Sequence, residues 1–115
     1  LHDAGVVMCC GSDGIRDTWG PYGNADMLER AMIVGLRNNL RRDDEVELAL
    51  DMVTHGGARA MELEGYGLAV GCHADIVLVD AQAPAEAVAA RPPRRLVLKR
   101  GRVVARDGKA LATAP

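Results

Sequence analysis

The sequence predicts a small α/β protein with one buried strand, a glycine-rich loop, two or three helices and a final meander of short strands. Three observations support this prediction. An apolar run near the N-terminus, residues 6–10, is typical of a strand buried on both faces of a parallel sheet. The middle of the chain has apolar residues at helical spacing, and the last third has short β-branched runs separated by turn signals.

The composition is that of a soluble globular protein. The 115 residues include 14 Lys and Arg against 16 Asp and Glu, and 49% are hydrophobic. No window approaches the roughly 18 to 20 apolar residues of a membrane span, and the N-terminus has no signal-peptide pattern. The basic residues of the last third have no interleaved aromatic residues, so neither a membrane nor a nucleic acid is an expected partner.

The cysteines indicate the cellular compartment of the chain, and its first residue indicates whether it is part of a longer protein. Cys9, Cys10 and Cys72 cannot form an even disulfide framework, so free thiols and a cytoplasmic location are expected. A length of 115 residues suits one small domain. The chain begins with Leu1 rather than Met, however, and we expect it to be a piece of a longer protein.

Helical spacing follows the loop at residues 11–24. Asn24 is the expected N-cap of the first helix, which should end at residues 37–39. Asp44 and Glu47 have the form of a capping box and predict the start of a second helix. A third, short helix is expected to follow Thr54 and to stop at Gly65.

After residue 71 the spacing of the apolar residues changes from that of helices to that of strands. Residues 74–80 are typical of a strand, residues 81–93 of a connection, and residues 96–99 and 102–105 of two further strands. Asp-Gly at residues 107–108 predicts a tight turn before a last short strand.

The loop at residues 11–24 is the segment most suited to chemistry. It carries four of the 13 glycines and two of the three aromatic residues, and it follows the predicted buried strand. Asp13 would therefore lie at the carboxyl end of a strand, where α/β proteins assemble active sites. A carboxylate there can bind a divalent metal ion or act as a general base. The alternative is that Asp13 only caps the turn that follows it.

Residues 11–21, Gly-Ser-Asp-Gly-Ile-Arg-Asp-Thr-Trp-Gly-Pro, are followed by Gly-Asn-Ala-Asp-Met-Leu at residues 23–28. Together they resemble the last barrel strand and loop of cytosine deaminase-like members of the amidohydrolase superfamily. Residues 53–61 and 65–80 resemble the C-terminal signature of the same superfamily. The resemblance thus extends over nearly the whole chain.

This resemblance implies the C-terminal portion of a (β/α)8 TIM barrel together with C-terminal strands of a small β-sandwich. Residues 1–68 would belong to the barrel and residues 69–115 to the sandwich. Asp13 would be a catalytic residue and a ligand of a divalent metal ion, Zn or Fe, and would also move protons. Trp19 would line the substrate pocket.

The chain departs from the family pattern in ways that affect the expected activity. Gly14 replaces a second acidic residue of the bacterial cytosine deaminases, and Thr18 replaces a proline, so cytosine itself is in doubt as the substrate. The His-x-His motif and the other ligands of the family are absent. His55 and His73 do not match ligand positions, and one carboxylate cannot hold a catalytic metal.

We therefore expect a metal-dependent hydrolase that deaminates a cytosine-like amino-heterocycle through a metal-activated water. This segment alone should be inactive, and its partners would be a small-molecule substrate and the missing N-terminal portion of the enzyme. The resemblance also implies a homo-oligomer. Two alternatives are an amidohydrolase that acts on a cyclic or linear amide, such as an N-acyl or N-carbamoyl compound, and a non-catalytic α/β interaction module.

Overall fold

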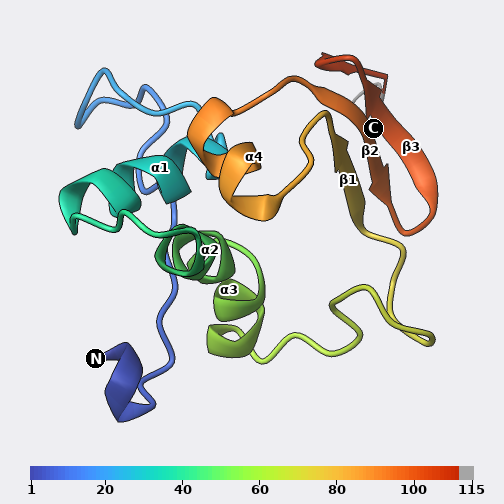
Figure 1. The fold of residues 1–115 in the computed structure, drawn as a ribbon. Coiled ribbons are helices and arrows are strands. Elements are labelled where there is room, and N and C mark those ends of the chain that lie inside the picture. Colours follow the sequence, from blue (N-terminus) through green and yellow to red (C-terminus); the bar gives the residue numbers. More distant parts are fainter. Residues whose placement is uncertain (112–115) are drawn as a thin grey trace.

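The computed structural model describes residues 1–111, so the last four residues of the predicted sandwich segment lie outside the described part. Helices and an antiparallel sheet form two lobes side by side (Figure 1). The helices are η1 (His2–Ala4), α1 (Met27–Arg37), α2 (Asp43–Met52), α3 (His55–Ala60) and α4 (Pro84–Ala90). The strands are β1 (Ile76–Val79), β2 (Arg94–Lys99), β3 (Arg102–Arg106) and β4 (Lys109–Ala110).

The strand predicted at residues 6–10 is wrong for the chain as it stands. These residues have no regular secondary structure, and Val6 and Val7 are 47% and 54% exposed. A strand needs a neighbour for its backbone groups, and here the backbone N–H of Cys10 donates to the carbonyl oxygen of Met52 (2.9 Å) on α2 instead. The apolar run is present, but the described residues supply no strand to pair with it.

The helices of the middle segment were predicted correctly, but their caps were not. The N-cap of α1 is Asp26, whose carboxylate accepts hydrogen bonds from the backbone N–H groups of Leu28 and Glu29. Asn24 supports that cap by accepting from the N–H of Asp26 (2.9 Å). Asn38 follows the last residue of α1, as predicted.

The second and third helices also differ from the prediction at their ends. Glu45 caps α2 by accepting from the backbone N–H groups of Arg41 and Arg42 (2.7 and 3.0 Å), so the predicted pair of Asp44 and Glu47 does not form the cap. The third helix ends at Ala60, well before the predicted stop at Gly65, because the chain enters a left-handed conformation at Glu62 (φ 52°).

Helix α4 lies in a segment predicted to be an irregular connection. Pro84 occupies its first turn, where the missing backbone N–H of proline costs nothing. The helix packs against α1 and α2, and its Val88 is the largest fully buried side chain. Val88, Ala31 and Ala49 form the core cluster, so the helical lobe is centred on small residues.

The sheet is a continuous antiparallel meander in the order β1-β2-β3-β4, as the turn signals predicted. Its first strand is fixed by Asp75, whose carboxylate accepts from the backbone N–H of Arg100 (2.6 Å) and forms an ion pair with Lys99. Asp75 thereby joins the start of β1 to the turn between β2 and β3.

Within residues 1–111, one ion pair connects the two lobes. Arg94, the first residue of β2, pairs with Asp26, the N-cap of α1, and both side chains are less than one third exposed. Arg94 also donates to the carbonyl oxygen of Pro92 (3.2 Å). The position of the sheet is thus linked directly to the end of the loop at residues 11–24. The division into barrel and sandwich segments at residue 68 stays a prediction.

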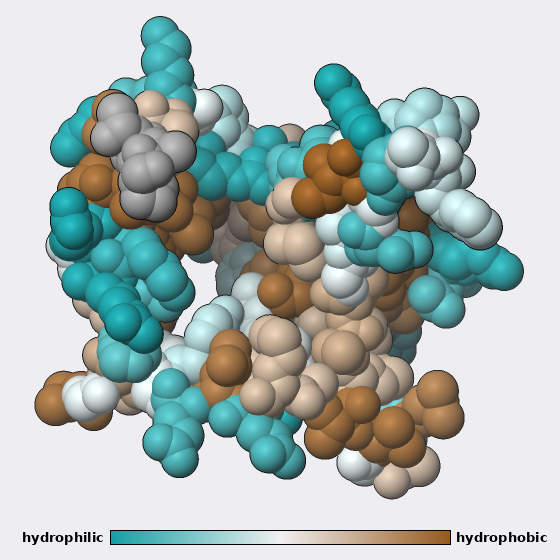
Figure 2. All heavy atoms as spheres, turned by 180° about the vertical axis from the view of Figure 1, so that it is seen from behind, coloured by the Kyte–Doolittle hydropathy of each residue, from teal (hydrophilic) through white to brown (hydrophobic). Residues whose placement is uncertain are grey.

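The fold leaves a large apolar surface uncovered. The radius of gyration is 14.8 Å, larger than the roughly 13 Å of a compact domain of about 100 residues. Figure 2 shows an open gap between the lobes and hydrophobic surface at the edge of the molecule. Leu1, Leu68 and Val70 are each more than four-fifths exposed. Among the described residues, no helix has the length and apolarity to cross a membrane.

The contact between α3 and the N-terminal segment predicts opposite effects at two adjacent glycines. A Cβ at Gly56 would collide with the backbone carbonyl oxygen of Met8 and lie 2.9 Å from that of Asp51. Gly56→Ala should therefore lower the free energy of unfolding by about 1 to 3 kcal/mol. At Gly57 the nearest atom is 4.0 Å away, so Gly57→Ala should raise it by about 0.5 to 1 kcal/mol. Urea unfolding measures both variants, and equal effects would contradict the contact.

Asp75 predicts a pH-dependent contribution to stability. The hydrogen bond from Lys99, followed by that from the Arg100 N–H, holds the pKa of Asp75 below its ordinary value of 3.8. Because the folded state lowers this pKa, the ionised carboxylate stabilises the fold above pH 3.8, and this contribution is lost as the pH falls through the folded-state pKa. Asp75→Asn should be less stable than the parent at pH 7, and the difference should shrink in acid. A difference independent of pH would argue against the pairing.

Candidate functional site

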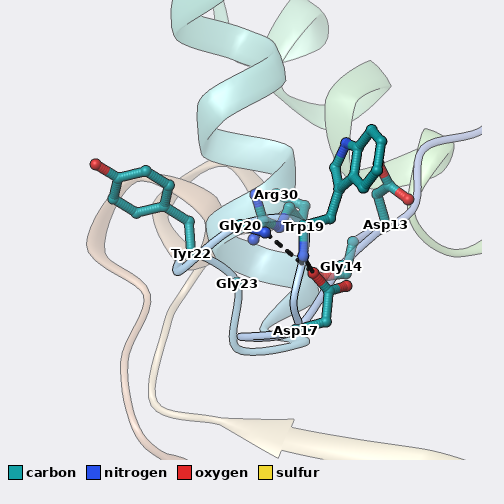
Figure 3. Close-up of a pocket in the computed structure, with 9 residues that line it drawn as sticks. Asp13, Gly14, Asp17, Trp19, Gly20, Tyr22, Gly23 and Arg30 are labelled. Atoms are coloured by element: carbon teal, nitrogen blue, oxygen red, sulfur yellow. Dashed lines mark hydrogen bonds between the residues drawn. The ribbon is translucent and has the colours of Figure 1, made fainter.

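The loop predicted to carry chemistry forms a hollow next to the first turn of α1. The hollow has a volume of about 260 Å³. The side chains and backbone of nine residues line it: Ser12, Asp13, Gly14, Asp17, Trp19, Gly20, Tyr22, Gly23 and Arg30. Eight of them come from the loop and one from α1 (Figure 3). The structure therefore brings together both predicted site residues, Asp13 and Trp19.

Asp17 builds the turn of this loop. Its Oδ1 accepts hydrogen bonds from the backbone N–H groups of Trp19 (2.9 Å) and Gly20 (3.1 Å), which Figure 3 draws as dashed lines. An aspartate that accepts from the backbone two and three residues ahead forms an Asx turn. This turn fixes the backbone that carries the Trp19 side chain.

Two glycines let the ends of the loop approach each other. Gly23 has φ +100°, and a Cβ there would collide with the backbone carbonyl oxygen of Gly14. A side chain at Gly14 would in turn meet Oδ2 of Asp17 at 2.5 Å. The N–H of Arg16 donates to the carbonyl oxygen of Tyr22 (3.0 Å) across the same narrow neck. The absence of an acidic side chain at residue 14 thus fits the packing of this loop.

Asp13 has a free carboxylate. It is exposed, lies in the left-handed region (φ 56°), and its side chain accepts no hydrogen bond from any described residue. The capping role considered as the alternative for Asp13 is performed by Asp17. The carboxylate of Asp13 is therefore available at the hollow for a ligand, a proton or a metal ion.

Trp19 presents its indole ring almost entirely to solvent, with 97% of the residue exposed. The residue lies on the same side of the hollow as Asp13, whereas the ring of Tyr22 points away on the opposite side (Figure 3). A large apolar ring left uncovered beside a polar hollow is a surface that a planar ligand or another part of a protein can cover.

Sequence reasoning missed two polar groups of this hollow. Ser12 Oγ and Arg30 Nε are buried and have no hydrogen-bond partner among the described residues. An unsatisfied buried polar group costs about 1 to 3 kcal/mol, so such groups usually have a partner. A sequence signal existed for Arg30, because a cation in the first turn of a helix opposes the helix dipole and needs another reason to be there.

The predicted metal ion fits this chain only in part. Asp13 is a suitable oxygen ligand, but the described residues contain no group of three His, Cys, Asp or Glu side chains that could hold a metal. His55 packs edge-on against the ring of Tyr66, with ring centroids 5.3 Å apart, and burial raises the pKa of the tyrosine. His73 lies against Gly65. Neither histidine is among the residues that line the hollow.

Comparison with known proteins gives consistent matches over the chain. The model of the amidohydrolase family matches residues 1–105. N-isopropylammelide isopropyl amidohydrolase of Pseudomonas sp. strain ADP is 38% identical over 108 residues, which are 93% of this chain and 27% of that protein.

Two solved structures resemble the chain closely. The N-isopropylammelide isopropylaminohydrolase of Burkholderia multivorans is 56% identical with a TM-score of 0.93, over 96% of this chain and 28% of that one. The 5-methylcytosine deaminase of Klebsiella pneumoniae is 30% identical with a TM-score of 0.85, over 100% of this chain and 28% of that one. The chain thus spans little more than a quarter of the length of these relatives.

The neck of the loop predicts a different outcome for two glycine variants. Gly23→Ala should open the loop, because the new Cβ collides with the carbonyl of Gly14 and the backbone has a positive φ. The amide of Arg16 should then lose its protection from hydrogen exchange, measured by NMR. Gly20→Ala is the matched control, since no atom lies within 4 Å of its Cβ position. Unchanged protection of Arg16 in Gly23→Ala would contradict the geometry.

Proposed function

Because the chain belongs to the amidohydrolase family, we propose that it supplies the catalytic loop of a hydrolase that removes an amine from an amino-heterocycle. The observation that carries this proposal is the free carboxylate of Asp13 beside Trp19 in a loop whose turn is fixed by another aspartate, Asp17. The relatives that match the chain act, by their names, on N-isopropylammelide and 5-methylcytosine, both amino-substituted rings.

Asp13 is proposed as the proton carrier of the reaction. A water molecule adds its oxygen to the ring carbon that bears the amino group, and Asp13 accepts the proton that the water gives up. The carboxylic acid then delivers this proton to the exocyclic nitrogen as the bond between that nitrogen and the ring carbon breaks, and the amine leaves. The second proton of the water stays on the heterocycle, as a hydroxyl or, after transfer to a ring nitrogen, as the N–H beside an oxo group. A divalent Zn or Fe ion, for which Asp13 would be one ligand, would make that water more acidic.

Trp19 is proposed as a wall of the substrate pocket. Its exposed ring offers a rigid apolar face to a planar heterocycle. Gly14 leaves space beside Asp13 where a side chain would meet Asp17. The identity of 56% to the isopropylammelide enzyme, against 30% to the 5-methylcytosine deaminase, favours a triazine ring with an alkylamino group over cytosine.

The catalytic unit is proposed to be larger than this chain. Asp13 is a single candidate ligand, whereas a catalytic metal needs about three protein ligands. The lack of a paired strand at residues 6–10 among the described residues and the exposed apolar side chains support a barrel completed by residues from outside this chain. Residues 1–68 would then serve the barrel and residues 69–115 the sandwich.

A chimera tests this function. The chain replaces the matching 28% of the Burkholderia multivorans enzyme, and release of isopropylamine from N-isopropylammelide is measured. We expect the chimera to be active and the isolated chain with added Zn²⁺ to be inactive. Asp13→Asn should lower kcat of the chimera by about 10²- to 10⁴-fold, since it removes the proton acceptor.

Asp3→Asn is the matched control for the chimera. Asp3 is an exposed aspartate of η1 outside the hollow, so the same chemical change there should leave kcat unaltered. An Asp13→Asn chimera as active as the parent, or turnover by the isolated chain, would refute the proposal. Ring opening instead of amine release would favour the amide-hydrolysing alternative.

A further inference from the structure

Almost nothing packs against the indole ring of Trp19. The residue is 97% exposed, so its place beside the hollow depends on the backbone that carries it. Among the described residues, the N–H groups of Trp19 and Gly20 have one acceptor, Oδ1 of Asp17 (2.9 and 3.1 Å; Figure 3). The backbone hydrogen bond across the loop joins Arg16 to Tyr22 and does not involve Trp19. One side chain, that of Asp17, therefore holds the backbone of Trp19.

The carboxylate of Asp17 can take this position because residue 14 has no side chain. A Cβ at Gly14 would lie 2.5 Å from Oδ2 of Asp17 and 3.1 Å from its Cγ. Gly14 does not have a positive φ, so an alanine there would meet this collision without added backbone strain. To relieve it the carboxylate would have to move away from the N–H groups that it accepts. The turn at Asp17 thus requires a glycine at residue 14.

The turn uses the oxygen of Asp17 and not its charge. Among the described residues, Asp17 forms no ion pair. An asparagine side chain carries the same acceptor oxygen and forms the same kind of turn, whereas alanine has no acceptor. Asparagine and alanine at residue 17 therefore separate the hydrogen bonds from the charge.

We propose that Asp17 is a positioning residue, which fixes Trp19 so that the indole ring is in place before the substrate ring binds, and that Gly14 makes this possible. This inference rests on the proposed function, because it takes Trp19 as a wall of the substrate pocket. A wall that is fixed in advance favours binding, since the substrate does not have to order the loop. Asp17 acts only through Trp19, while Asp13 moves the proton.

Kinetics of the chimera distinguish positioning from a merely structural role. Asp17→Ala should raise KM for N-isopropylammelide about three- to tenfold, the range of one aromatic contact, and leave kcat within about twofold. A loss of folded enzyme would instead lower the apparent kcat at an unchanged KM. Asp17→Asn should keep the parent KM. Asp3→Ala, the same truncation at an exposed aspartate outside the hollow, is the control.

Two double variants test whether Asp17 acts through Trp19 and depends on Gly14. Trp19→Ala should raise KM at least as much as Asp17→Ala, and adding Asp17→Ala to it should change nothing further. Gly14→Ala should raise KM as Asp17→Ala does, because its Cβ displaces the carboxylate. Adding Gly14→Ala to Asp17→Ala should likewise have no further effect on KM.

Hydrogen exchange in the 115-residue chain tests the positioning without turnover. The amides of Trp19 and Gly20 should exchange faster in Asp17→Ala and in Gly14→Ala than in the parent, because both changes remove their acceptor. In Asp17→Asn they should exchange at the parent rate. Far-UV circular dichroism verifies that each variant is folded.

Unchanged exchange in Asp17→Ala, additive KM effects of Asp17→Ala and Trp19→Ala, or a KM in Asp17→Asn as high as in Asp17→Ala would overturn the inference. These outcomes leave an active chimera, and with it the proposed hydrolysis, standing. An inactive chimera together with faster exchange in Asp17→Ala would count against the hydrolysis alone and would support the hold of Asp17 on Trp19.

Discussion

The carboxylate of Asp26 connects three parts of this chain. Asp26 lies just after the glycine-rich loop. Its carboxylate caps helix α1 by accepting from the backbone N–H groups of Leu28 and Glu29, and it pairs with Arg94 at the start of β2. A capped N-terminus determines where the helix begins, and therefore where Arg30 lies relative to the loop. The ion pair between Asp26 and Arg94 attaches the sheet to the same N-cap residue. The hollow, the helix and the sheet thus share one anchor, and the arrangement of the candidate site depends on it.

The loop is shaped by contacts within itself, whereas the segment before it needs contacts with other segments. Residues 14–23 close on themselves through the Asx turn of Asp17, the bond from Arg16 to Tyr22 and the glycine neck, so local contacts suffice to shape them. Residues 6–10 are apolar and half-exposed, with backbone groups that a sheet would pair. An apolar segment of this kind forms a strand only where neighbouring strands pair with its backbone. The shape of the loop therefore depends on contacts within this chain, whereas the proposed barrel would need residues from outside it.

The sequence was most informative where a signal is local. Helical spacing located α1 and α2, and the Asp-Gly turn located the last hairpin. Helix α4 was missed because its alanines give no amphipathic contrast, although Pro84 is a typical start. The strand at residues 6–10 was predicted from its apolar pattern. A strand also needs neighbouring strands to pair with, and the pattern of one segment does not show whether they are present. A motif was enough to propose Asp13 and Trp19 as site residues, whereas the unpartnered Nε of Arg30 needed the structure, because only packing shows that a donor has no acceptor.

Hydrogen exchange of individual amides tests most directly whether the loop is shaped by this chain alone while residues 6–10 depend on residues from outside it. It is measured by NMR in the isolated chain and by mass spectrometry in the chimera with the Burkholderia multivorans enzyme. The account predicts that the amides of Arg16, Trp19 and Gly20 are protected in both, because their acceptors lie within the loop. The amides of residues 7–9 should exchange freely in the isolated chain and become protected only in the chimera. Protection of residues 7–9 in the isolated chain, or free exchange of the loop amides in both proteins, would contradict this prediction.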